Sequence, residues 1–110
     1  MPKLSEVLDA ARKHVAGGWH EPLSLAADGT ICDVQSEGIA KFCTHDAIVV
    51  AAAGDGGVAV DAELALARQL ELSGEKRSLT TWLEDEHRMH GDVLRLFTTA
   101  AAHARATEGR

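Results

Sequence analysis

The sequence predicts a mainly α-helical fold, a small bundle of three to five helices with at most one short β-hairpin. Three observations favour it. The apolar content is rich in alanine, the best helix former. Apolar side chains recur with the helical period in several segments, and glycine-containing turns separate those segments. A chain of 110 residues is long enough for one core and too short for two, so we expect a single domain over 1–110, with a polar tail at about 107–110.

The first predicted helix spans residues 3–16. Its apolar residues follow the spacing i, i+3, i+4, i+7 and i+11, which places them on one face. They are Leu4, Val7, Leu8, Ala11 and Val15. Gly17 and Gly18 follow and end the helix, because glycine tolerates the backbone conformations found at helix ends.

Asp28-Gly29 predicts a β-turn between two short apolar segments. Leu23 and Leu25 alternate before the pair, and Ile31 follows it. This pattern favours a short hairpin, with a structured loop as the alternative.

The second predicted helix runs from a Ser36 cap to about Ala53, before Gly54. Its inward stripe would comprise Ile39, Phe42, Cys43, Ala47 and Val50. Residues 47–53 also fit a buried strand, but the alanine content favours helix.

Three further elements are predicted. Asp55-Gly56-Gly57 is expected to form a flexible turn, followed by a helix from an Asp61 cap to about Leu72. Thr81 is expected to cap a short helical turn that begins at Trp82. The last helix is predicted from His90 or Asp92 to about Ala106, burying Val93, Leu94, Phe97, Ala100, Ala101 and Ala104.

The helical stripes also predict which residues form the centre of the core. These residues are Leu4, Leu8, Val15, Phe42, Val50, Leu66, Leu94 and Phe97.

The net charge of −6 argues against direct nucleic-acid binding, which needs a basic surface. The longest apolar run, 47–53, is far short of the roughly 20 residues of a membrane span. No basic segment precedes an apolar stretch at the N-terminus, as a secretory signal would require. We therefore expect a cytoplasmic protein with no membrane association.

The order of these features resembles a family of small uncharacterised proteins from actinobacteria and their phages, a domain of unknown function. The shared features are Gly18-Trp19, Asp28-Gly29 followed by Cys32, the alanine-rich segment after Phe42-Cys43, Trp82 at a short turn, and a final helix that opens with residues 92–97. The family usually follows its tryptophan with Asn-Asp, where this chain has Leu83-Glu84, and Met89 stands where the family has a threonine cap. The resemblance implies a fold and a phage- or mobile-element-like source, and no activity.

Two kinds of site follow from the residues. Cys32 and Cys43 with His87 and His90 supply the ligand types of a tetrahedral zinc site, and a cysteine with His45 or His87 supplies those of a thiol nucleophile. The spacings fit neither motif well, and Cys43 is also interpreted as a small buried hydrophobe. This thiol- or zinc-dependent module is the alternative hypothesis.

The favoured hypothesis is a non-enzymatic protein-interaction module without a cofactor. Its candidate interaction residues are the two tryptophans and the acidic cluster that follows the second of them: Trp19, Trp82, Glu84, Asp85 and Glu86. Exposed tryptophan is a common anchor of interfaces, and the acids suit a basic protein surface. A protein partner is expected, homo-oligomerisation is possible on this hypothesis, and a regulatory or anti-defence role would fit a phage-like source.

Overall fold

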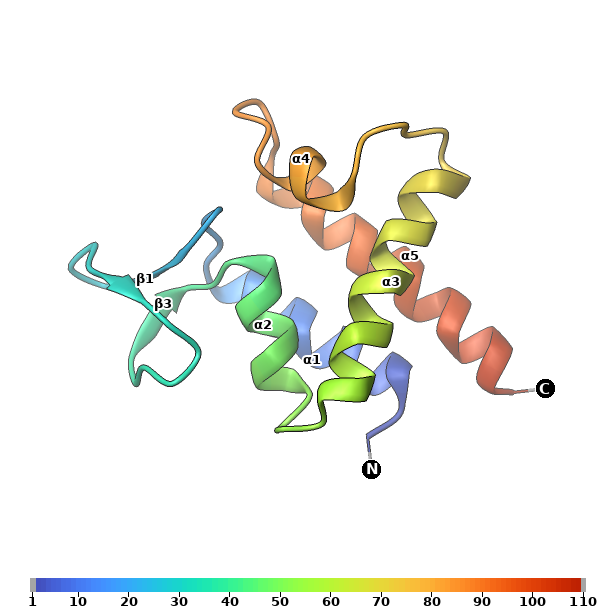
Figure 1. The fold of residues 1–110 in the computed structure, drawn as a ribbon, viewed down its shortest axis with the longest axis horizontal. Coiled ribbons are helices and arrows are strands. Elements are labelled where there is room, and N and C mark those ends of the chain that lie inside the picture. The colour runs from blue at the N-terminus through green and yellow to red at the C-terminus, as the bar shows by residue number, and fades with distance from the viewer. Residues whose placement is uncertain (1, 110) are drawn as a thin grey trace.

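A computed structural model describes residues 2–109, which form five helices and three short strands. The elements are α1 (Leu4–Gly17), β1 (Ser24–Ala26), β2 (Ile31–Cys32), β3 (Ile39–Lys41), α2 (Thr44–Ala51), α3 (Gly56–Leu72), α4 (Leu79–Leu83) and α5 (His90–Glu108). The mainly α fold with a small sheet is confirmed. Figure 1 shows the helices gathered together, with the strands projecting to one side beyond α2. Among residues 2–109, no helix is long and apolar enough to cross a membrane.

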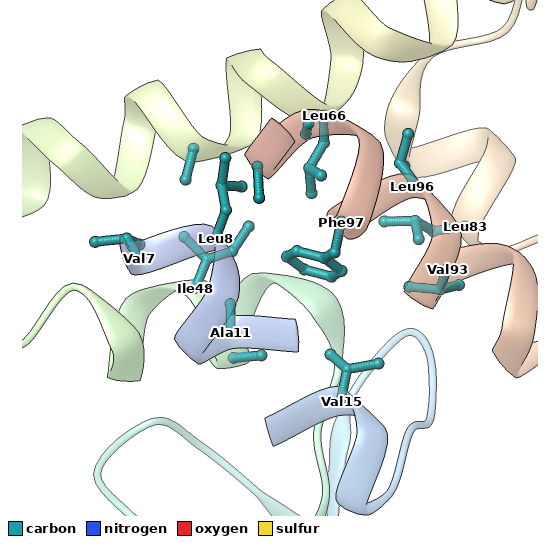
Figure 2. Packing of buried hydrophobic residues seen from close by; sticks show 14 of the residues in the cluster. Val7, Leu8, Ala11, Val15, Ile48, Leu66, Leu83, Val93, Leu96 and Phe97 are labelled. Atoms are coloured by element: carbon teal, nitrogen blue, oxygen red, sulfur yellow. The ribbon is translucent and has the colours of Figure 1, made fainter. Parts of the chain in front are cut away.

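The core lies between α1, α2, α3 and α5. Its largest fully buried side chains include Phe97, Leu8, Ile48 and Leu66. Figure 2 shows the Phe97 ring in the middle of this cluster, with Leu8 and Ile48 on one side of it. The apolar stripes of α1 and α5 therefore face one another, as their helical spacing predicts.

Most of the predicted core is confirmed. Leu8, Val15, Leu66 and Phe97 are fully buried, while the partly buried side chains of Leu4, Phe42 and Leu94 pack against the cluster. The prediction for Val50 is wrong, since that side chain is 37% exposed.

The predicted hairpin at Asp28-Gly29 is confirmed, and a third strand joins it. β1 pairs antiparallel with β2 on one edge and with β3 on the other, giving the order β2-β1-β3. The Asp28 carboxylate accepts a hydrogen bond from the Thr30 N–H at 2.9 Å, and Gly29 has φ of +87°. This side-chain bond and the glycine conformation are local features of a tight turn.

The predicted helix from 36 to 53 is wrong in its first half, and its strand alternative is wrong as well. Residues 39–41 form β3, which pairs with β1 through Leu25 and Lys41, and the helix begins only at Thr44. The buried face of α2 is formed by the residues around Ala47 and Ile48, and Val50 lies outside that face. The pattern missed this because β-pairing with a distant strand is a tertiary contact.

Two predicted helix starts are also wrong. α3 begins at Gly56, where the Asp55 carboxylate accepts from the Val58 N–H at 3.2 Å, so the expected flexible turn is the first turn of the helix. α4 begins at Leu79 with Ser78 as its cap, three residues before Trp82. In each case the helix is capped by a residue earlier in the chain than the predicted one: Asp55 in place of Asp61, and Ser78 in place of Thr81.

The last helix starts at His90, as predicted, and continues past Ala106 to Glu108. The Ser5 hydroxyl and backbone N–H donate to the two carboxylate oxygens of Glu108, at 2.6 and 3.1 Å. These two bonds join the end of α5 to the start of α1. They extend the helix into the segment predicted to be a polar tail.

Candidate functional site

Two adjoining hollows lie where residues 19–22 approach the end of α4. Both are lined by Glu21, Pro22, Leu83 and Glu84. One, of about 290 Å³, is also lined by Trp19, His20, Asp85, Glu86 and Arg88. The other, of about 240 Å³, also reaches Thr44, His45 and Glu63. We call the two hollows together the acidic cleft.

Trp19 is placed by the backbone that follows α1. The Phe42 N–H donates to the Gly18 carbonyl at 2.8 Å, and the His20 N–H donates to the Phe42 carbonyl at 3.0 Å. A Cβ atom at position 18 would collide with the Ala40 carbonyl oxygen, so this close approach requires glycine. The glycine that ends the first helix therefore also sets the position of the cleft residues.

The side chain of Glu21 is the main polar contact of this segment. One of its carboxylate oxygens, Oε2, accepts from the Trp19 indole N–H at 2.8 Å, the Thr44 N–H at 2.9 Å and the Thr44 hydroxyl at 2.5 Å. Since Thr44 opens α2, the carboxylate also lies at the positive end of a helix dipole. Glu21 thus fixes both the tryptophan and one wall of the cleft.

The Trp19 ring is half-buried and stacks on the imidazole of His90, with 5.9 Å between ring centroids. His90 Nε2 donates to the Val15 carbonyl at 2.6 Å, at the end of α1. The tryptophan is therefore held by Glu21 and by His90 of α5, and these two side chains are themselves bonded to Thr44 of α2 and to Val15 of α1.

The acidic residues after α4 differ in how far they are engaged. Asp85 accepts from the Arg77 guanidinium and the His87 N–H, both at 2.8 Å, and these bonds hold the pKa of Asp85 below its ordinary value, Arg77 contributing most. Glu86 lies 3.4 Å from the His87 imidazole and is highly exposed. The Glu84 carboxylate makes no hydrogen bond or ion pair with any residue of 2–109. Glu84, which borders both hollows, is thus open to a partner.

Trp82 has a different position from Trp19. It is 8% exposed and belongs to the hydrophobic core. The Arg88 guanidinium lies 3.7 Å from the centroid of its ring, and Arg88 Nε donates to the Trp82 carbonyl at 2.9 Å. This cation–π contact covers the Trp82 ring and holds the Arg88 guanidinium in place. Arg88 is the one arginine among residues 2–109 that lines the acidic cleft.

The structure does not bring the four residues of the zinc hypothesis together. Cys32 lies in β2 and Cys43 precedes α2, both as buried free thiols. His87 is highly exposed, and His90 is bonded to Val15. Across residues 2–109, no group of three or more His, Cys, Asp or Glu side chains is arranged to hold a metal ion. The geometry therefore does not support this alternative.

Cys43 occupies the cap of α2 rather than the middle of a helix. Its sulfur accepts from the Asp46 N–H at 3.4 Å, and its backbone N–H donates to the Ser24 hydroxyl at 2.9 Å. Burial raises the pKa of the Cys43 thiol above its ordinary value, which disfavours the thiolate. His45 lies on the exposed side of α2, where its Nδ1 is hydrogen-bonded to the Glu63 carboxylate. This environment is that of a structural cysteine.

Sequence reasoning missed Glu21, Thr44 and Glu63. The only local signal was a carboxylate two residues after Trp19, because the other contacts join segments about twenty residues apart. The structure does bring Trp19 and residues 84–86 to one hollow, as a common interaction surface would require.

Residues 1–103 match the family model described as a family of unknown function, DUF6197. The chain belongs to this family. No curated protein and no solved structure matches the chain. The family description carries no activity, and the feature of the structure that bears on function is the geometry of the cleft.

Proposed function

We propose that this member of DUF6197 is a non-enzymatic protein-interaction module whose acidic cleft binds a basic segment of a partner protein. The observation that carries the proposal is the position of Glu84: it is exposed, it borders both hollows, and its carboxylate has no partner within residues 2–109. Glu86 adds a second exposed carboxylate beside it.

The cleft combines apolar and acidic surface. Pro22, Leu83 and the half-buried Trp19 ring supply apolar contacts, while Glu84 and Glu86 supply the charge. A lysine or arginine side chain fits this arrangement, because its aliphatic stem packs on apolar surface while its charged head stays near carboxylates and water. The net charge of −6 also favours encounter with a basic partner.

The two imidazoles that line the cleft, those of His20 and His45, make hydrogen bonds to neighbouring residues. His20 Nδ1 donates to the Leu23 carbonyl at 2.7 Å, and His45 pairs with Glu63. These contacts fix the orientation of the imidazoles and support a preformed binding surface. The phage-like source and a regulatory or anti-defence role stay predictions of the resemblance.

A display library of random peptides, selected against the purified protein, tests the proposal. We expect the selected peptides to be enriched in lysine and arginine and to bind Glu84→Lys about tenfold or more weakly, because like charges replace an attractive pair. Glu37→Lys is the matched control, since it makes the same charge change at an exposed residue between β2 and β3.

The control should bind the selected peptides as the wild type does. Selection of peptides without basic residues, or equal binding by Glu84→Lys and the wild type, would contradict the proposal.

A further inference from the structure

α3 exposes more large apolar side chains than its position in the bundle explains. Val60, Leu64 and Leu72 are 56%, 61% and 65% exposed. Val60 and Leu64 lie one turn apart on the same face, and the half-buried Ala67 continues that face. The outer face of a helix in a monomer is ordinarily polar, and clustered apolar side chains mark an interaction surface.

A groove runs beside this face, between α3 and α5. Its volume is about 670 Å³, and its apolar walls include Leu64, Ala65, Ala100 and Ala104. The three alanines leave room for a bulky side chain from another helix to approach the backbone closely. The apolar face of α3 and this groove together form a ridge and a hollow against which another helix can pack.

The charged residues that flank Leu64 on this face of α3 are complementary between two copies of the chain. Asp61 precedes Leu64 by three residues and Arg68 follows it by four. Both are exposed, and neither forms an ion pair with any residue of 2–109. When two copies of α3 pair antiparallel about Leu64, Asp61 of each copy faces Arg68 of the other. A parallel pairing would place Asp61 opposite Asp61.

We infer that a second copy of this chain covers the face, through a two-fold symmetric, antiparallel pairing of the two α3 helices. Leu64 of each copy enters the groove of the other, and two Asp61–Arg68 ion pairs flank the contact. The surface is self-complementary, as a two-fold interface must be. This interface shares no residue with the acidic cleft, and the two proposals stand independently.

Sedimentation velocity from micromolar to millimolar protein tests the apolar contact. The wild type should self-associate, and Leu64→Glu should do so about tenfold or more weakly, since it places a charge at the centre of the interface. Ile31→Glu is the matched control, because Ile31 on β2 is 65% exposed and lies outside this face. Circular dichroism establishes that both variants keep the helical fold.

Charge exchange tests the orientation. Asp61→Arg alone and Arg68→Asp alone should each lose self-association, because each sets like charges opposite one another. An equal mixture of the two variants should restore it, since both flanking pairs of the mixed dimer are then of opposite charge. Glu84→Lys should leave the association unchanged.

A wild type that stays monomeric at millimolar concentration overturns the inference, and so does association that Leu64→Glu leaves intact. A mixture no more associated than its separate components overturns the antiparallel pairing.

Discussion

The contact between α1 and α5 and the junction between β1 and α2 are stabilised in opposite ways. The first has an apolar centre, with Leu8, Val93 and Phe97 fully buried, while its polar bonds lie in exposed or partly buried positions at the margin. The second is polar although it is equally buried: the Ser24 hydroxyl donates to Asp46 Oδ2 at 2.7 Å and accepts from the Cys43 N–H at 2.9 Å. Ser24 is fully buried and Asp46 nearly so.

The difference bears on where the candidate site lies. Hydrophobic contacts stabilise in proportion to buried area and are not directional, whereas hydrogen bonds specify distances and angles. The acidic cleft is attached at the polar junction, where Glu21 accepts from Thr44 immediately after Cys43. The apolar region therefore supplies most of the stability, and the polar junction sets the geometry of the site.

The largest effect is expected from the apolar region. Phe97→Ala should lower the free energy of unfolding by about 3–5 kcal/mol, because it removes a fully buried ring from the centre of the core (Figure 2). Urea unfolding measures it. A loss below about 1 kcal/mol would mean that the α1–α5 contact is loosely packed and that the contrast with the junction is false.

A smaller effect is expected at the polar junction. Ser24→Ala removes the hydroxyl that joins Asp46 to the Cys43 N–H, and leaving those buried groups unpaired costs about 1–3 kcal/mol. Ser73→Ala is the control, since that exposed serine only donates to the Leu70 carbonyl at the end of α3. Urea unfolding should show less than about 0.5 kcal/mol for the control. Equal effects at the two serines would show that the junction is not specially dependent on its polar bonds.

Cys43→Ala should cost about 1 kcal/mol, because it removes a small buried side chain and the sulfur that caps α2. Burial and the raised pKa also predict that the native Cys43 thiol reacts slowly with a thiol reagent and rapidly once unfolded. Unfolding with and without a chelator completes the test. We expect no chelator effect on either protein, and a chelator that strongly destabilises only the wild type would indicate a metal site.

The smallest effect is expected where α5 meets the start of α1, and it depends on pH. The Ser5 hydroxyl, and after it the Ser5 N–H, lowers the pKa of Glu108 below its ordinary value of 4.5. A lowered pKa in the folded state stabilises the fold above the ordinary value, and that contribution is lost as the pH falls through the folded pKa. The wild type should therefore exceed Glu108→Gln in stability at neutral pH and lose that advantage below pH 4.5.

Urea midpoints of both proteins at neutral and acidic pH measure this difference. Glu37→Gln is the control, because Glu37 is an exposed glutamate outside this contact. A stability difference for Glu108→Gln that does not change with pH would show that the terminal contact does not depend on the carboxylate charge.

The elements that can be predicted from the sequence are those whose signals are local. The stripe of Leu8, Ala11 and Val15 predicts α1, the stripe around Phe97 predicts α5, and Asp28-Gly29 predicts the hairpin turn, because each pattern lies within a few residues of chain. Local composition also predicts Trp19 and Glu84 as candidate interaction residues.

Other features depend on contacts between distant segments of the chain. Residues 39–41 fit a helical stripe but form β3, because β1 satisfies their backbone hydrogen bonds from another part of the chain. Gly56 and Gly57 are poor helix formers, yet they open α3 because Asp55 caps it and Val58 packs against the core. The cleft depends in the same way on Glu21 meeting Thr44 across more than twenty residues. A local pattern carries no information on such pairings, since each depends on which distant segment supplies the partner.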